Sequence, residues 1–273
     1  MNIVAVVNQK GGVGKTTTAI NLGAALGALE RRVLLVDCDP QGNASRGLAI
    51  EASPPLLYEA LRGESTLADC VRPTGFPGLD IVPSNRDLVG IEVEFVGQAG
   101  WEHRLREALG TIDGYDLVLL DCPPSLGHLT ICALTAADRV LIPLQCEYFA
   151  LEGMGELLAT LRRVRQTLNP SLEVAGIVLT MYDERTRLSK DVVAEVRRHF
   201  SDRVYNTVVP RNIRLAEAPS HGIPVLQYDI KSRGAQAYLS LARELLPTLA
   251  VAPKEAAGPA RGGVGGERSE EGL

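Results

Sequence analysis

Short apolar runs alternate with helical patterns over most of the 273 residues, and this alternation restricts the fold more than any other feature. Several runs are almost continuously apolar, as strands covered on both faces are. The predicted strands are residues 3–7, 32–37, 79–84, 115–121, 139–145, 174–180 and 204–210. The predicted helices are residues 16–29, 86–97, 101–110, 151–168, 189–200 and 234–246. We therefore predict an α/β fold with a doubly wound, mainly parallel sheet and helices on both faces.

The alternation continues without a break in composition to about residue 248, which predicts one domain over residues 1–248. Residues 249–273 are rich in Gly, Pro, Ala and Glu and hold almost nothing to bury, so we expect a disordered tail. The chain shows no hydrophobic leader, and no apolar stretch approaches the roughly 20 residues of a membrane helix. We therefore expect a cytoplasmic protein.

The net charge of −5 gives no overall reason to expect nucleic-acid binding, so any basic surface must be local. The five cysteines are scattered, odd in number and without a C-x-x-C pair, which favours buried, reduced thiols. The four histidines are also scattered, and no metal site built from them is indicated.

The segment NQKGGVGKTTT, residues 8–18, joins the first predicted strand to the first predicted helix. It approaches the phosphate-loop pattern G-x-x-x-x-G-K-[ST], but Gln9 stands at the first glycine position and Lys10 follows it. Gly11, Gly12 and Gly14 let backbone N–H groups turn inward around phosphate oxygens, where larger side chains would block the approach. The helix N-terminus adds its partial positive charge, so the context favours a nucleotide phosphate site.

The side chains that follow the loop suit the rest of such a site. Lys15 is expected to contact the β- and γ-phosphates, Thr16 to place its hydroxyl on Mg²⁺, and Thr17 to reach the α-phosphate. A magnesium carboxylate is expected at the end of a buried strand, and LVLLDCPP supplies Asp121 after four apolar residues.

A second acidic pair, Asp37 and Asp39, comes from LLVDCDPQGN at the end of the second predicted strand. An open α/β sheet places its ligand crevice at this edge. Carboxylates two residues apart on an extended segment point the same way, towards Mg²⁺ or an attacking water. Pro40, Gly42 and Asn43 then predict a tight loop able to respond to the γ-phosphate.

Four ordered motifs, KGGVGKTT, DCDPQGN, DCPP and VPRNIRLAEAPSHG, give the chain a specific resemblance. Together they resemble the ParA/Soj family of chromosome and plasmid partitioning ATPases, over roughly residues 1–248. This family belongs to the deviant Walker A group of P-loop NTPases, which also contains the MinD cell-division ATPases. The resemblance implies ATP and Mg²⁺ as cofactors and a homodimer that closes on ATP.

The resemblance also implies roles for individual residues. Lys10 would reach across the dimer to the phosphates held by the partner chain, and Gly12 would pack closely at the same interface. The implied catalytic residues are Lys10, Lys15 and Asp39. Thr16 and Asp121 would serve Mg²⁺, with Asp39 acting indirectly and Asp37 as an additional candidate. The implied nucleotide-binding residues are Lys10, Gly11, Gly12, Val13, Gly14, Lys15, Thr16, Thr17, Pro210 and Asn212, the last two at the adenine.

Basic residues are concentrated between Arg185 and Arg233, a segment that contains ten basic and five acidic residues although the whole chain is acidic. This asymmetry is typical of a surface that binds a phosphate backbone. The resemblance to Soj proteins singles out Arg185 and Arg214 as DNA contacts. Additional candidates are Arg187, Lys190, Arg211 and Arg233. No recognition-helix pattern is apparent, so we expect binding to double-stranded DNA without sequence preference, and association with the nucleoid.

Three alternatives remain at this point. A MinD-like ATPase would end in a basic amphipathic helix on the membrane, whereas the last residues here are rich in Gly and Glu. A P-loop biosynthetic enzyme would need a second substrate pocket, which nothing in the sequence marks. An iron–sulfur role like that of the nitrogenase iron protein would need two cysteines at a dimer axis, and Cys122 and Cys132 look like packing residues. Larger plasmid relatives carry an N-terminal helix-turn-helix domain, which we do not expect here.

The family resemblance implies one further partner. Intrinsic turnover is expected to be slow, with a centromere-binding protein of the ParB/Spo0J type as the activator of hydrolysis. The sequence itself shows no site for this partner.

Overall fold

The computed structural model describes residues 1–148, 151 and 153–249. Its strands are β1 (Asn2–Val6), β2 (Val33–Asp37), β3 (Arg72–Pro73), β4 (Leu79–Val82), β5 (Leu117–Asp121), β6 (Arg139–Gln145), β7 (Glu173–Tyr182) and β8 (Val204–Pro210). They form one eight-stranded sheet in the order β3-β4-β2-β5-β1-β6-β7-β8. Every pair is parallel except β3 with β4, so the predicted, mainly parallel sheet is confirmed.

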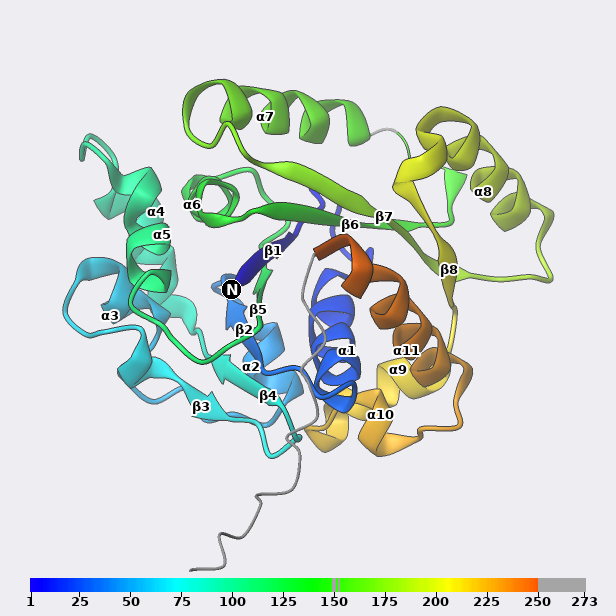
Figure 1. The fold of residues 1–273 in the computed structure, drawn as a ribbon, viewed down its shortest axis with the longest axis horizontal. Coiled ribbons are helices and arrows are strands. Elements are labelled where there is room, and N and C mark those ends of the chain that lie inside the picture. The colour runs from blue at the N-terminus through cyan, green and yellow to red at the C-terminus, as the bar shows by residue number, and fades with distance from the viewer. Residues whose placement is uncertain (149–150, 152, 250–273) are drawn as a thin grey trace, which may run out of the picture.

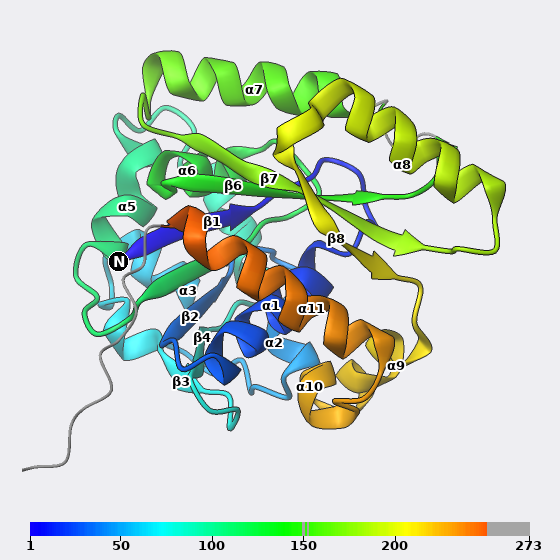
Figure 2. The same cartoon turned by 45° about the vertical axis from the view of Figure 1, so that its right-hand side comes forward.

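Helices cover both faces of the sheet (Figures 1 and 2). The helices are α1 (Lys15–Ala28), α2 (Asn43–Gly47), α3 (Leu57–Arg62), α4 (Gly90–Glu94), α5 (Arg104–Leu109), α6 (His128–Ala136), α7 (Met154–Thr167), α8 (Arg187–Phe200), α9 (Ile213–Glu217), α10 (Val225–Tyr228) and α11 (Arg233–Leu245). Short 3-10 turns span Ala68–Cys70, Arg86–Val89, Trp101–His103, Ser201–Arg203, Ala218–His221 and Leu246–Leu249.

The hydrophobic core has two halves because successive strand residues point to opposite faces. Val4 and Val6 of β1 pack with α1 and α11, whereas Ala5 packs with α5, α6 and α7 on the other face. The predicted double winding is therefore confirmed. Leu249, which the sequence assigned to the tail, is buried in the first of these halves. The rest of the predicted tail, residues 250–273, lies outside the described residues.

Several element boundaries differ from the predictions. The expected helix 86–97 is a 3-10 turn followed by the five-residue α4, and residues 101–110 likewise divide into a 3-10 turn and α5. The sequence did not predict the short elements β3, α2, α3, α9 and α10. The two-residue β3 is an edge strand, which accommodates Pro73 because an edge position does not require its missing N–H.

Candidate functional site

The glycine-rich loop between β1 and α1 is fixed from two sides. Asn8 donates its side-chain amide to the Pro143 carbonyl of β6 (2.7 Å) and accepts from the backbone N–H of Lys10 (2.9 Å). From β7, the Thr180 hydroxyl donates to the Val13 carbonyl (2.8 Å). At the end of the loop, Gly14 has a φ of 89°, a left-handed conformation that favours glycine. Among the described residues no side chain caps α1, so its first N–H groups are available to an anion.

Lys15 lies at the floor of the cavity enclosed by this loop. The cavity has a volume of about 400 Å³, and its walls include Gly11, Thr16, Asp39 and Met181. The Lys15 ammonium donates to the Lys10 carbonyl (3.1 Å), and the residue is only 7% exposed. Burial lowers the pKa of Lys15, whereas the Asp121 carboxylate opposes that shift. A buried cation at a helix N-terminus is suited to a polyphosphate.

Lys10 takes a different position, although it belongs to the same loop. It is partly buried and is absent from the described residues that line the 400 Å³ cavity. Gly12 is exposed on the same loop with a φ of 75°, and a Cβ added there would meet no described atom of this chain within 4 Å. The open side of the loop therefore has room for another molecule.

Asp121 ends β5, directly beside Asp37 of β2 in the register of the sheet. Its side chain is fully buried, and neither carboxylate oxygen has a hydrogen-bond partner among the described residues. Burial and the Asp37 carboxylate raise the pKa of Asp121 well above its ordinary value, and the nearby Thr16 hydroxyl offsets only part of this. A hard cation satisfies such oxygens, so Thr16 and Asp121 fit Mg²⁺.

Asp37 and Asp39 have separate environments. Asp37 is fully buried and accepts from the backbone N–H (2.9 Å) and hydroxyl (2.7 Å) of Ser45 and from the Asp39 N–H (3.2 Å). It therefore fixes the loop into α2 and has little free capacity for a metal. Burial raises the pKa of Asp37 to about 6. Asp39 accepts from the Gln41 N–H (2.9 Å) and lines the cavity, so it can reach a ligand there.

A second cavity of about 190 Å³ adjoins the first and shares Gly14, Thr17 and Met181 with it. Pro210 and Asn212, which the family resemblance assigned to the adenine, line this cavity. The Asn212 side-chain oxygen accepts from the Arg214 N–H (2.9 Å) and caps α9. No hydrogen bond from its amide NH₂ is found among the described residues, so this group can donate to a ligand. The two adjoining cavities can hold a phosphate chain and a base.

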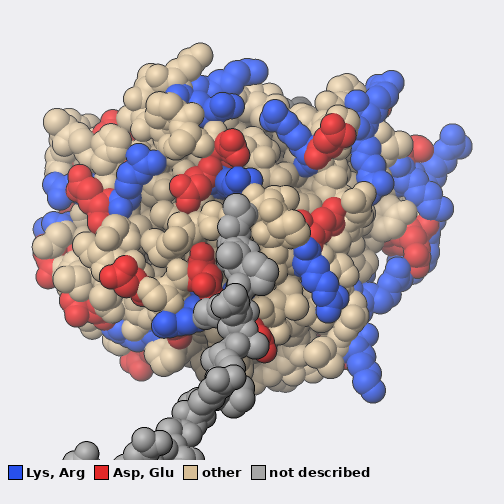
Figure 3. Space-filling model, in the orientation of Figure 1, with Lys and Arg blue, Asp and Glu red and all other residues tan. Residues whose placement is uncertain are grey.

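The six residues assigned to DNA come from the β7–α8 loop, α8, the segment that follows β8, α9 and α11. All lie beyond the carboxyl ends of β7 and β8 or on the helices that follow them. Lys and Arg side chains gather on the right-hand side of Figure 3, over the part of the fold labelled α8, α9 and α11 in Figure 1. Arg185 and Arg233, which the sequence placed in one basic segment, are 48 positions apart. The Arg233–Glu184 ion pair shows that their elements adjoin.

Sequence reasoning missed the acidic residues of the same surface. Asp183 and Glu184 precede the basic segment by two residues and one residue, and both form ion pairs with its arginines. Including them brings seven acidic residues against ten basic ones. Both acids precede Arg185 in the sequence DER, residues 183–185, directly before the basic segment, which starts at Arg185.

The cysteines, further metal sites and membrane spans were also addressed by the sequence. All five cysteines are buried and free of disulfides. In the part of the chain that the structure describes, no group of His, Cys, Asp and Glu side chains forms a further metal cluster, and no helix has the length and apolarity to cross a membrane.

The fold and the site define a phosphate-loop nucleotide-binding protein of the α/β class. Residues 1–174 match the sequence profile of an AAA domain family. The chain is 55% identical over 251 residues to the chromosome partitioning protein ParA of Caulobacter vibrioides, covering 90% of this chain and 94% of that protein. It is 52% identical over 246 residues to the sporulation initiation inhibitor protein Soj of Bacillus subtilis, with coverages of 89% and 97%. The chain belongs to the ParA/Soj family of chromosome partitioning ATPases.

A solved structure of similar fold is the cobyrinic acid a,c-diamide synthase from Mycobacterium smegmatis, crystallised with ADP and magnesium. It is 40% identical, covers 90% of this chain and 94% of its own, and superposes with a TM-score of 0.80.

Proposed function

We propose that this chain is a DNA-partitioning ATPase whose ATP-bound form is a homodimer that binds DNA without sequence preference. ATP with Mg²⁺ is its substrate, and hydrolysis to ADP and phosphate returns the dimer to monomers. The observation that carries the proposal is the position of Lys10, on the phosphate loop but outside the lining of the cavity that the loop encloses. A lysine so placed suits the phosphates of a second chain.

The chain's own residues divide the work. The loop N–H groups and Lys15 bind the phosphates, and Pro210 with Asn212 holds the adenine. Thr16 and Asp121 would hold Mg²⁺, which when bound neutralises phosphate charge. Asp39 orients the attacking water, and Lys10 of the second chain adds positive charge beside the γ-phosphate. Gly12 lies at the contact between the chains.

We assign the cellular role to chromosome or plasmid partition and the location to the nucleoid, with a ParB/Spo0J-type protein as activator. The two partitioning relatives, at 55% and 52% identity, support this assignment more strongly than the biosynthetic name of the 40% identical structure. An amide-forming synthase would also need a pocket for its second substrate. The 190 Å³ cavity adjoins the phosphate cavity, and in this proposal the adenine occupies it.

Lys10→Ala is expected to leave ATP affinity unchanged and to impair the ATP-bound dimer or its turnover. Cationic groups supplied to the γ-phosphate by another chain raise hydrolysis by about 10³-fold or more. Light scattering with a slowly hydrolysed ATP analogue measures the dimer, and phosphate release measures turnover. Lys10→Arg, which keeps the charge, serves as the matched control. An intact ATP-bound dimer with full wild-type turnover after Lys10→Ala would refute the trans role.

Asp39→Ala is expected to form the ATP-bound dimer but to hydrolyse ATP roughly 10²-fold more slowly or worse, since it loses the group that positions the water. Asp39→Asn is the matched variant, because its amide oxygen can still accept from the Gln41 N–H and keep the turn. Both variants are examined by size-exclusion chromatography with ATP and by phosphate release. A purely monomeric Asp39→Asn, or one with normal hydrolysis, would remove Asp39 from this role.

A further inference from the structure

The basic surface holds its arginines in ion pairs with carboxylates of the same chain. Five of the six residues assigned to DNA lie within 4 Å of a carboxylate oxygen, and among the described residues Lys190 alone of the six forms no ion pair. The pairs are Arg185–Asp183, Arg187–Asp191, Arg211–Glu147, Arg214–Glu217 with Asp229, and Arg233–Glu184. Phosphate must therefore compete with internal anions for most of these guanidinium groups.

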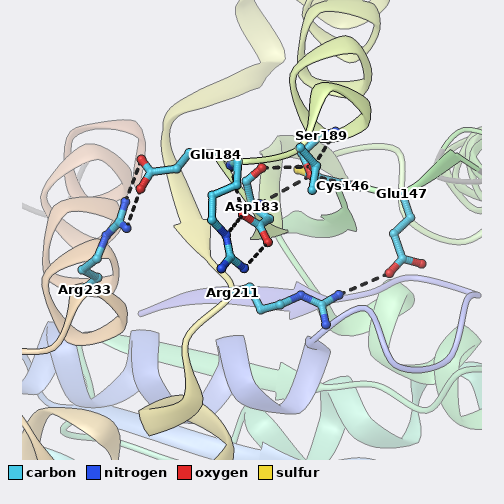
Figure 4. Close-up of polar contacts among 9 residues, drawn as sticks. Cys146, Glu147, Asp183, Glu184, Ser189, Arg211 and Arg233 are labelled. Atoms are coloured by element: carbon cyan, nitrogen blue, oxygen red, sulfur yellow. Dashed lines mark hydrogen bonds and ion pairs between the residues drawn. The ribbon is translucent and has the colours of Figure 1, made fainter.

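Glu184 and Arg233 form an exposed pair that resembles a phosphate contact. The Arg233 guanidinium donates Nη1 to Oε1 (2.9 Å) and Nη2 to Oε2 (3.2 Å) of Glu184. This two-pronged geometry is the one with which arginine binds phosphate. The two side chains are 67% and 58% exposed, and such exposed pairs contribute little to stability. Figure 4 shows the pair linking the β7–α8 loop to the start of α11.

Asp183, the neighbouring acid, has a structural role that Glu184 lacks. It accepts from the backbone N–H (3.0 Å), Nε (2.9 Å) and Nη2 (2.7 Å) of Arg185, and its own N–H donates to the Ser189 hydroxyl (3.4 Å). Its side chain is only 19% exposed. By contrast, both hydrogen bonds described for the Glu184 side chain go to Arg233. Glu184 can therefore leave its partner without disturbing the turn.

A shallow groove of about 510 Å³ lies beside this pair, between the edge strand β8 and α11. Arg233 and Lys231 both line it, together with Thr207 and Gln236. Lys231 forms no ion pair among the described residues. Once Glu184 has left, Arg233 and Lys231 can both face an anion in the groove.

We propose that Glu184 is an internal competitor for DNA phosphate: it occupies the guanidinium of Arg233 and is displaced when a backbone phosphate enters the groove beside Lys231 and Arg233. The inference rests on the DNA binding proposed above and adds a subsite and a residue that limits affinity. Displacing Glu184 costs free energy each time the protein binds DNA, and this lower affinity favours release from DNA after hydrolysis.

Glu184→Gln is expected to raise the affinity of the ATP-analogue-bound protein for a short random-sequence duplex by about three- to tenfold, because the competing charge is lost while the side-chain size is kept. The slope of log affinity against log salt should steepen by at most about one. In the wild type, Arg233 exchanges the Glu184 carboxylate for a phosphate, whereas in Glu184→Gln the phosphate contact is no longer offset by a lost carboxylate contact. Fluorescence anisotropy at several salt concentrations measures both quantities. Nucleotide affinity should be unchanged.

Glu195→Gln is the matched control. Glu195 pairs with Arg198 (2.7 Å) on α8, so its substitution removes the same charge from an ion pair that lies away from the groove. It should raise affinity less than Glu184→Gln. The gain from Glu184→Gln should disappear in an Arg233→Ala background. Provided that the wild-type protein binds DNA, any of three results would overturn the competitor role. These are an unchanged or weaker affinity after Glu184→Gln, an equal gain from Glu195→Gln, and a gain that persists without Arg233. Failure of the wild-type protein to bind DNA would instead overturn the proposed function, and this inference with it.

Discussion

Lys15→Ala is expected to lower ATP affinity by roughly 100-fold or more and to abolish ATP-dependent DNA binding. The lysine is a buried cation at the floor of the phosphate cavity, and a charge-assisted hydrogen bond contributes about 1.5–3 kcal/mol. The loss should exceed the contribution of one such bond, because a bound polyphosphate would offer several oxygens to one ammonium group in this site. Isothermal titration with ATP and Mg²⁺ measures the affinity directly.

The control must separate binding from folding, since Lys15 also faces the buried carboxylates of Asp121 and Asp39. Lys15→Gln removes the charge but keeps most of the side-chain length and an N–H donor. Thermal unfolding of both variants without nucleotide reports their stability. Lys10→Ala removes a lysine from the same loop and should retain ATP affinity. Wild-type ATP affinity in a folded Lys15→Ala protein would contradict the assignment.

Arg185→Glu combined with Arg214→Glu is expected to keep the ATP-driven dimer and to lower DNA affinity by about 100-fold or more. Each reversal removes a charge-assisted contact of about 1.5–3 kcal/mol and adds repulsion from phosphate. Both residues lie outside the two nucleotide cavities, so ATP affinity should not change. A gel shift with the ATP analogue measures DNA retention, and light scattering measures the dimer.

Two variants make this result specific. Arg104→Glu with Arg163→Glu produces the same change in net charge on α5 and α7, outside the basic segment, and should affect DNA binding far less. Because Arg214 contacts Glu217 (2.8 Å) and Asp229 (3.4 Å), Arg214→Gln tests its contribution without adding a third carboxylate. Unchanged DNA retention in the double reversal would place the DNA surface elsewhere.

Much of the fold could be predicted because apolar periodicity reports burial. The runs at 3–7 and 139–145 became β1 and β6 within a residue or two, and the helical pattern at 16–29 became α1. Elements such as α9 and α10 were missed because they span only four or five residues and carry no usable periodicity. Tertiary contacts maintain them, as when the Asn21 side chain accepts from the Val225 N–H (2.7 Å) at the start of α10.

The phosphate site was predicted more completely than the basic surface. A phosphate loop is local in sequence, so Lys15 and Thr16 could be assigned from spacing, and Asp121 from its place at a strand end. The different environments of Asp37 and Asp39 depend on Ser45, which spacing does not reveal. The Arg233–Glu184 pair joins residues 49 positions apart, and only the folded chain brings them together.

The most direct test of the central claim is DNA affinity in different nucleotide states. Fluorescence anisotropy with a random-sequence duplex is measured with the ATP analogue, with ADP and without nucleotide, while light scattering gives the molecular mass and anionic lipid vesicles are tested in parallel. We predict that only the ATP analogue produces a dimer and that this dimer binds DNA at least about tenfold more tightly than the ADP form. The DNA affinity of the dimer should fall steeply as the salt concentration rises. Vesicles should not retain the protein. Equal DNA affinity in all three states, or capture by vesicles in place of DNA, would contradict the account.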